Sequence, residues 1–215
     1  METPQRARRT KREAILRATA GAIASHGVRG MRVETVAADA GVSVALLYYH
    51  FQNRIELTRA ALHYAHERAP STGALAELPP HRMAYDALEA ALLAELDDAP
   101  EVRDFSIVWG ELAACAVFET TLRADFEFVC RSWTNDVARA IRAGISDGSI
   151  ASDTDPECAA QVLTTLADGL CARWLAGVVQ LEEARGLLRE ALQRELRPPD
   201  VGPAQGDGRH AVEVH

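Results

Sequence analysis

The sequence lacks the cysteine spacings that hold structural metals or disulfide frameworks. Its four cysteines, none of which forms a C-x-x-C pair, are Cys115, Cys130, Cys158 and Cys171. We therefore expect no zinc site and no disulfides; burial as small apolar side chains is the ordinary role of such residues, and a redox-sensing thiol is the alternative. His63 and His66 lie one helical turn apart, but without a third ligand nearby they predict helix packing and not a metal site. No cofactor is expected.

Long apolar runs and enzyme motifs are also missing. No stretch approaches the length of a membrane span, and the basic N-terminus is not followed by the apolar run of a signal peptide, so we expect a cytoplasmic protein with no membrane partner. The chain contains no phosphate-binding loop, G-x-G-x-x-G, G-x-S-x-G or H-E-x-x-H, and its scattered Ser, His and Asp residues do not assemble into a site from sequence. We therefore expect a protein that is not an enzyme and has no catalytic residues.

Strand-type alternation is absent as well, and this decides the expected fold class. Apolar residues recur with helical spacing almost throughout residues 82–197. A hydrophobic content of 48% is ample for a buried core in a chain of 215 residues. We expect an all-α protein. Beyond the N-terminal region, helices are expected at about residues 82–98, 101–118, 120–147, 156–178 and 181–197.

The formal net charge of −8 would by itself argue against a nucleic-acid partner, but the charge is unevenly distributed. Residues 1–70 hold 11 Lys and Arg against 6 Asp and Glu, whereas residues 71–215 hold 12 against 25. A basic head on an acidic body can attract phosphates with one end while the other end stays off the duplex. An acidic surface that merely prevents aggregation explains the body but not the asymmetry.

The stretch between residues 33 and 54 has the pattern of two short helices joined by a tight turn. Val33, Val36 and Ala37 recur at i, i+3 and i+4 and give the first helix an apolar face. Gly41 can take the left-handed conformation that ends a helix. Ser43 then suits the N-cap of the next helix, because its hydroxyl can accept from a free backbone N–H.

In the second short helix, Leu47 and Phe51 lie four positions apart and are expected to face inward. Tyr48 and Tyr49 are expected on the opposite side. Two short helices joined by a Gly-containing turn form a helix-turn-helix, whose second helix enters the major groove of DNA. An ordinary helical hairpin is the alternative.

The run A-A-D-A-G-V-S, followed by L-L-Y-Y-H-F and then by Arg54 and Leu57, resembles the DNA-binding signature of the tetracycline-repressor (TetR) family of bacterial regulators. The resemblance is specific over about residues 10 to 65. It implies an N-terminal three-helix helix-turn-helix DNA-binding domain followed by a helical ligand-binding and dimerisation domain. The expected parts are a disordered basic arm (1–9), the DNA-binding domain (10–52), a connecting helix (53–68), the ligand-binding and dimerisation domain (69–197) and a disordered tail (198–215).

Two helix boundaries in this region can be placed more closely. The first helix is expected from about Thr10 to His26, with Gly27 as its C-terminal stop. The connecting helix is expected to begin at Asn53, with Glu56 as the capping-box partner three positions on.

The resemblance also indicates which residues touch DNA. It places Val44, Ala45 and Tyr48 at base edges. Val44 and Ala45 offer no side-chain hydrogen bonds, so they can read only shape and thymine methyl groups. Sequence discrimination therefore shifts toward Tyr48, toward Ser43 or Thr35, and toward DNA deformability. The resemblance assigns phosphate contacts to Tyr49, His50 and Arg54, and the Arg32 side chain can also reach a phosphate. The full expected set is Arg32, Thr35, Ser43, Val44, Ala45, Tyr48, Tyr49, His50 and Arg54.

The middle of the chain holds most of the large aromatic residues, and the family places its effector pocket there. The expected ligand-binding residues are Phe105, Trp109, Phe118, Phe126, Trp133 and Trp174. Core packing is the alternative for each of them. Carboxylates are interspersed with the rings, at Glu111, Asp125 and Glu127, which would suit a cationic or amine-bearing ligand. Solvated surface acids are the alternative for these three residues.

The last two long helices are the expected dimer surface. Their apolar stripes include Leu163, Leu166, Leu170, Leu188 and Leu192. The alternative is that these stripes form the core of a single chain. DNA recognition favours a homodimer, because one short recognition helix contacts too few base pairs for useful specificity.

These observations predict a ligand-responsive, DNA-binding transcriptional regulator. Repression relieved by a small-molecule effector is the common mode of the family, with a palindromic operator as the double-stranded DNA partner. If the effector fits only when the connecting helix tilts, the two recognition helices no longer match the half-site spacing. The alternative function is a helical scaffold or ligand-binding protein without sequence-specific DNA binding.

Overall fold

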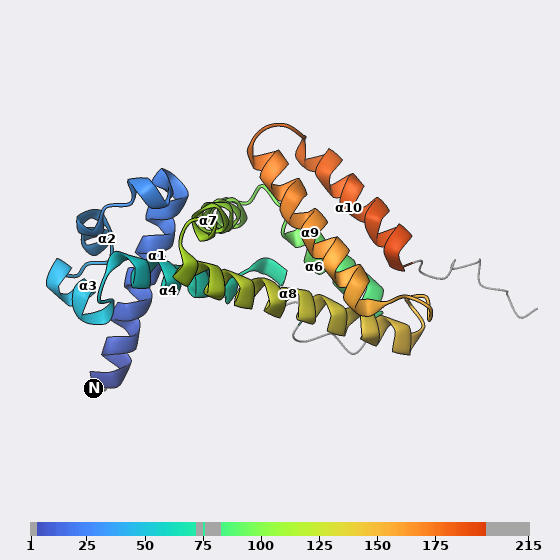
Figure 1. The fold of residues 1–215 in the computed structure, drawn as a ribbon, viewed down its shortest axis with the longest axis horizontal. Coiled ribbons are helices and arrows are strands. Elements are labelled where there is room, and N and C mark those ends of the chain that lie inside the picture. Colours follow the sequence, from blue (N-terminus) through green and yellow to red (C-terminus); the bar gives the residue numbers. More distant parts are fainter. Residues whose placement is uncertain (1–3, 72–74, 76–82, 197–215) are drawn as a thin grey trace, which may run out of the picture.

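The computed structural model describes residues 4–71, 75 and 83–196, without the side chains of residues 4–8. All regular elements among these residues are helices, which confirms the all-α prediction (Figure 1). The helices are α1 (Pro4–Gly30), α2 (Val33–Asp39), α3 (Val44–His50), α4 (Arg54–His66), α6 (Ala84–Ala94), α7 (Pro100–Ala116), α8 (Thr120–Asp147), α9 (Pro156–Leu175) and α10 (Leu181–Leu196).

The helix-turn-helix forms as the sequence predicts, because local hydrogen bonds specify its turn. Gly41 adopts a left-handed φ of 63°. The N–H of Val42 donates to the carbonyl of Ala37 at 2.9 Å, and the N–H of Gly41 donates to that of Ala38 at 3.0 Å, which is the Schellman pattern that ends a helix. Ser43 then caps α3 by accepting from the N–H of Leu46 at 3.1 Å.

The first helix is longer at both ends than the sequence predicts. It begins at Pro4, so the expected disordered arm over residues 1–9 is wrong for residues 4–9; proline suits the first turn of a helix, where its missing N–H needs no partner. Gly27 does not end the helix. It forms a kink with φ 69° and ψ 166°, and α1 resumes to Gly30. The expected tail at 198–215 lies outside the described residues.

The connecting helix is capped at the predicted residue. Asn53 accepts from the N–H of Glu56 at 2.9 Å, and the Glu56 carboxylate accepts in return from the N–H of Gln52 at 2.7 Å. By contrast, Arg32 at the start of α2 makes no side-chain cap. The remaining helices begin and end within a few residues of their expected bounds.

Two separate clusters of buried apolar residues hold the molecule together. The first, the head core, is built by α1 to α4 and is completed from outside that region by Val108, Leu112 and Ala116 of α7 and by Leu122 and Val129 of α8. The second, the body core, is built by α6, the second half of α8, α9 and α10. Helix α8 therefore runs from one core to the other, as Figure 1 shows.

Within the described ranges, no helix is both long enough and apolar enough to cross a membrane.

Candidate nucleic-acid interface and ligand cavity

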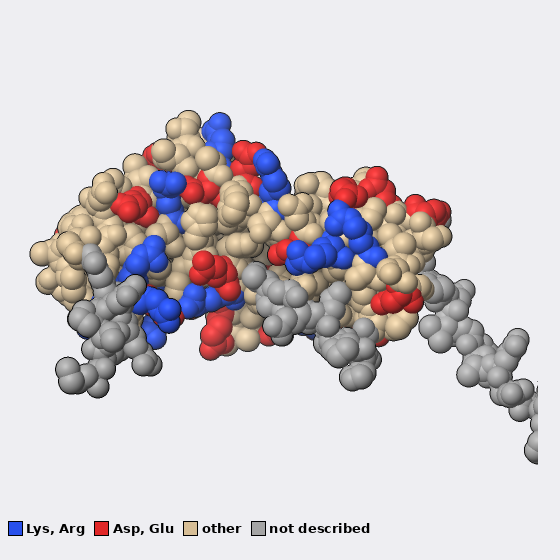
Figure 2. Space-filling model, turned by 90° about the horizontal axis from the view of Figure 1, so that it is seen from below, with Lys and Arg blue, Asp and Glu red and all other residues tan. Residues whose placement is uncertain are grey.

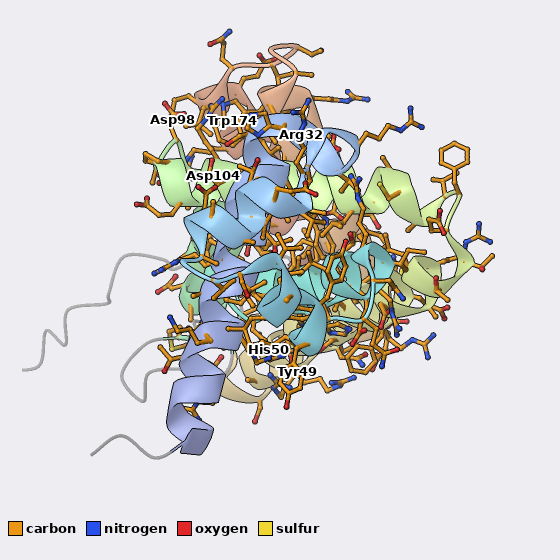
Figure 3. The ribbon with its side chains drawn as sticks, turned by 90° about the vertical axis from the view of Figure 1, so that its left-hand side faces the viewer. Arg32, Tyr49, His50, Asp98, Asp104 and Trp174 are labelled. Carbon is orange, nitrogen blue, oxygen red and sulfur yellow. The ribbon has the colours of Figure 1, made fainter. Side chains whose placement is uncertain are left out.

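Helix α3 presents one face to the head core and the other to solvent. Leu47 and Phe51 are each 1% exposed, as predicted, whereas Tyr48 is 45% and Tyr49 63% exposed. Exposed tyrosines on a short capped helix can donate hydrogen bonds to base edges or phosphates. Figure 3 looks onto this end of the molecule and shows Tyr49 and His50 together at the C-terminal end of α3.

The other expected DNA-binding residues spread over the same end of the molecule. Thr35, Ser43 and Ala45 are exposed, and Val44 is half-buried against the head core. Arg32 is exposed at the start of α2, and in Figure 3 it lies well away from Tyr49 and His50. A duplex that contacts both ends of this face would therefore span the helix-turn-helix.

Arg54 has a role that the sequence did not indicate. Its guanidinium donates to the backbone carbonyls of Val28 and Arg29, which lie just after the kink in α1. The first residue of the connecting helix thus holds the end of the first helix in place. A phosphate contact by Arg54 remains a prediction.

The surface charge of the head agrees with its expected partner. Figure 2 shows Lys and Arg side chains gathered on the underside of the left-hand part of the molecule, with acidic side chains beside them. Basic residues next to a helix-turn-helix supply the sequence-independent attraction to phosphates.

A cavity of about 30 Å³ lies where the head core meets the body core. Phe105 and Trp109 of α7 line it and pack against the head core. Trp133 of α8 and Ala167 of α9 line it and pack in the body core. The remaining lining residues are His66, Ala69, Ser71, Glu95, Ser106, Asp168 and Cys171. Since about 10–15 Å³ is the least volume that holds one water, the cavity has room for only a few water molecules.

Two carboxylates face this cavity. Asp168 of α9 accepts from the indole N–H of Trp109 at 3.0 Å. Burial raises the pKa of Asp168 to about 7; the nearby Glu95 adds to the rise, and the bond from Trp109 opposes it. Glu95, the C-cap of α6, accepts from the backbone N–H of Ser71 at 2.8 Å, and burial raises its pKa as well. No Lys or Arg is among the described residues that line the cavity.

Three of the six aromatic residues expected at the ligand site line the cavity: Phe105, Trp109 and Trp133. Phe126 lies behind Trp109, with ring centroids 4.8 Å apart. Phe118 is 78% exposed and lines a separate groove. Trp174 is buried in the body core, where the Arg103 guanidinium covers its ring. The one indole N–H in this cavity that has no hydrogen-bond partner belongs to Trp133.

The carboxylates that the sequence placed beside the rings lie elsewhere. Glu111 accepts from the backbone N–H of Val28 at 2.9 Å. Asp125 binds Arg59 and, at 3.1 Å, His63 on the connecting helix, and the hydrogen bond from Arg59 lowers the pKa of Asp125. Glu111 therefore joins α7 to α1, and Asp125 joins α8 to α4. Consecutive residues on a helix point in different directions, so a carboxylate next to a ring in the sequence does not have to face the same cavity.

The leucines expected at the dimer surface are mostly core residues of the single chain. Leu163, Leu188 and Leu192 are fully buried in the body core, and Leu170 is buried there as well. Only Leu166 is half-buried. Helix α9 packs mainly against α8 and α10, and α10 packs against α9 and α6, so most of these leucines are covered within the single chain.

The cysteine and histidine predictions have mixed outcomes. All four cysteines are free, but Cys158 is exposed on the first turn of α9, so its predicted burial is wrong. No group of His, Cys, Asp or Glu in the described part of the chain has the arrangement of a metal site. His63 contacts α8 through Asp125, while His66 lines the cavity, where burial lowers its pKa.

Comparison with known families accounts for most of the chain. Residues 15–61 match the family of bacterial regulatory proteins of the tetR type. Residues 84–197, more than half of the chain, match the C-terminal domain of BetI-type transcriptional repressors. The chain belongs to the TetR family.

Solved structures of TetR-family proteins superpose on most of its length. A TetR-family transcriptional regulator from Rhodococcus sp. is 40% identical, with a TM-score of 0.80 over 87% of this chain and 99% of its own. A transcriptional regulator from Saccharomonospora viridis, solved in complex with choline, is 25% identical, with a TM-score of 0.75 over 89% of this chain and 98% of its own. The fatty acid degradation regulator FadR from Bacillus halodurans, 19% identical with a TM-score of 0.70 over 85% of this chain and 93% of its own, shares the fold. Curated protein sequences give no match.

This TetR-family protein is a ligand-responsive, DNA-binding transcriptional regulator, as its sequence predicts. Its family is generally non-enzymatic, and repression is typical of the family. The head supplies an exposed α3 helix, and the junction of the two cores supplies a cavity lined by two carboxyl groups and aromatic rings.

Proposed function

We propose that the protein is a homodimeric repressor that binds a palindromic operator and is released when a small organic cation enters the cavity between the two cores. The observation that carries the effector class is the composition of the cavity wall. Two carboxylates, Asp168 and Glu95, face it together with three aromatic rings, and the described part of its lining contains no Lys or Arg. Carboxylates supply the counter-charge for a cation, and aromatic faces attract it further.

A relative supports this choice. The Saccharomonospora viridis regulator was solved in complex with choline, which is a small organic cation. The two carboxyl groups of the cavity accept from neutral donors, the Trp109 indole N–H and the Ser71 N–H, so a cation would supply the counter-charge that their ionised forms lack.

The dimer surface that we propose is the outward face of α9. A shallow groove runs along it, lined by Gln161, Val162, Thr165, Leu166, Gly169, Leu170 and Arg173. Val162 is 40% exposed and Leu187 of α10 is 42% exposed. A Cβ at Gly169 would meet nothing within 4 Å, so a helix of a second copy can approach closely. Two copies related by two-fold symmetry place two α3 helices on half-sites about one helical turn apart.

Release follows from the place of the cavity. Its free volume of about 30 Å³ is far smaller than a choline-sized molecule, so an effector must move the walls apart. Because the wall formed by α7 packs against the head core and the wall formed by α8 and α9 packs in the body core, this movement displaces the head relative to the dimer surface. The spacing of the recognition helices then no longer fits the operator, and operator and effector oppose each other's binding. The protein acts where its operator lies, in the cytoplasm.

Tryptophan fluorescence tests the effector class, because Trp109 and Trp133 both line the cavity. Choline is titrated against its uncharged isostere dimethylbutanol, in which carbon replaces the nitrogen. We expect choline to bind about thirtyfold more tightly, which corresponds to about 2 kcal/mol for a desolvated cation–π contact.

The matched control is Asp168→Asn, which keeps the shape of the side chain and an acceptor for the Trp109 indole N–H. This variant is expected to lose the preference for choline over dimethylbutanol. Equal binding of the two compounds to the unaltered protein, or an unchanged preference in Asp168→Asn, would refute the proposed effector class.

A further inference from the structure

The kink in α1 is contacted from two sides by helices that line the cavity. Glu111 of α7 accepts from the backbone N–H of Val28 at 2.9 Å. Arg54 of α4 donates to the carbonyls of Val28 and Arg29. The backbone groups left unpaired by the kink are therefore satisfied by side chains from the two helices that also lead to the effector site.

Glu111 fits the kink closely. A Cβ built on Gly27 would lie 2.7 Å from Glu111 Oε2, so the carboxylate rests directly against the Gly27 backbone. Gly27 itself has a positive φ of 69°, a conformation that favours glycine. The contact thus depends both on glycine at position 27 and on a carboxylate or amide at position 111.

The same helix carries the cavity wall. Phe105 and Trp109 line the cavity, and Trp109 is bonded to Asp168 of α9 at 3.0 Å. Glu111 follows Trp109 by two positions on α7, and Leu112 next to it is fully buried in the head core. A displacement of Trp109 is therefore passed to Glu111 through a continuous helix, without any flexible segment between them.

We infer that Glu111 is the residue that carries the effector signal from α7 to the kink of α1, and hence to α2 and α3. A displacement of α7 therefore moves the head through Glu111, and a tilt of α4 alone is not sufficient to move it. The alternative route runs through α4, which is joined to α8 by the contacts of Arg59 and His63 with Asp125. The inference rests on the proposed function, because it takes the cavity as the effector site.

A wedge in the cavity tests this route without any effector. Ala167 is buried, lies on α9 and lines the cavity, so Ala167→Leu forces the walls apart. Ala160 is equally buried on the same helix, belongs to the body core and does not line the cavity, so Ala160→Leu is the matched control. Cys171→Leu, also at the cavity wall, is a second wedge if Ala167→Leu does not fold.

Hydrogen exchange in peptides that cover residues 27–51 of the full chain is the readout. We expect the wedge to raise exchange there by about tenfold in the otherwise unaltered protein and in Glu111→Gln, whose amide oxygen can still accept from Val28. In Glu111→Ala the same wedge is expected to change exchange by less than about twofold, although peptides at the cavity still respond. Ala160→Leu is expected to leave residues 27–51 unchanged.

The inference is overturned if the wedge raises hydrogen exchange in residues 27–51 equally with and without Glu111. It is also overturned if the wedge raises this exchange only when the Asp125 carboxylate is intact, because that result would assign the route to α4. A wedge that alters cavity peptides but never residues 27–51 would also overturn it. Because the wedge replaces the effector, these results stand apart from the choline titration, whose failure would remove only the proposed effector class.

Discussion

The head core and the body core differ in how they use the chain. The body core is built from helices that follow one another closely, α6 to α10, with the exception of α7. The head core joins the first four helices to α7 and to the first half of α8, which come more than thirty positions later in the sequence. The head therefore contacts the rest of the chain through more than the connecting helix, because α7 and the first half of α8 complete its core.

This difference explains where the cavity lies. A ligand site in the middle of the body core would be insulated from DNA by packed side chains. Here one wall of the cavity belongs to each core, and the bond between Trp109 and Asp168 crosses from one to the other. A molecule that separates these walls acts on both cores at once, which is what coupling between two sites requires.

Core truncations test the division most strongly. Leu112 of α7 and Leu188 of α10 are both fully buried, the first in the head core and the second in the body core. Each substitution by alanine is expected to lower the free energy of unfolding by about 2–5 kcal/mol. Hydrogen exchange is expected to rise mainly in α1 to α4 for Leu112→Ala and mainly in α9 and α10 for Leu188→Ala. A uniform increase in both variants would mean that the two cores unfold as one unit.

The outward face of α9 provides the next test. Val162→Glu places one carboxylate from each copy into the proposed two-fold interface, and like charges there cost several kcal/mol. We expect this variant to be a monomer by light scattering at concentrations where the unaltered protein is a dimer, with its helical content preserved. Glu182→Gln, at an exposed position of α10, is the control. A dimer that persists in Val162→Glu would place the interface elsewhere.

In the head, a residue that contacts bases and a residue that contacts phosphates are expected to differ in how their loss changes sequence specificity. Tyr48→Ala is expected to weaken binding to the operator by about 1–3 kcal/mol and to leave non-specific binding unchanged. Arg54→Ala is expected to weaken all sequences alike and to reduce the salt slope by about one unit. Fluorescence anisotropy at several salt concentrations measures both. An unaltered ratio of specific to non-specific binding in Tyr48→Ala would contradict its role at a base edge.

The smallest expected effect concerns pH. The pKa of Asp168 is raised to about 7, and a cation binds to the ionised form. Affinity for choline is therefore expected to rise with pH up to about 7 and then level off, by at most about tenfold per pH unit below the pKa. Asp168→Asn is expected to flatten this profile. Affinity that falls as the pH rises would show that the protonated acid is the binding form.

The sequence predicts those parts of the molecule that depend on local interactions. The turn at Gly41, the caps at Ser43 and Asn53 and the inward positions of Leu47 and Phe51 all follow from neighbours within a few residues. The same holds for most helix ends in the second half of the chain. The sequence predicts a helix end at Gly27, because a glycine stops many helices. The contacts of Glu111 and Arg54 with Val28, just after the kink, come from distant parts of the chain and have no local signal.

The cavity depends on contacts that local patterns do not contain. Asp168 and Glu95 lie on different helices and come together only through packing of α6, α7 and α9. The carboxylates next to Trp109 and Phe126 in sequence were the visible candidates, but a helix turns them away from the rings. Most leucines of the expected dimer stripe lie in the body core for a related reason: periodicity identifies an apolar face without showing whether its partner is the same chain or another.

Binding to DNA from the region flanking the protein's own gene, with and without choline, is the most direct test of the account. A fluorescent native duplex is compared with a scrambled duplex at low and moderate salt. We expect the preference for the native duplex to survive moderate salt, and choline, but not dimethylbutanol, to abolish it. Native binding that choline leaves unchanged, or equal binding to both duplexes, would contradict an operator-binding repressor released by an organic cation.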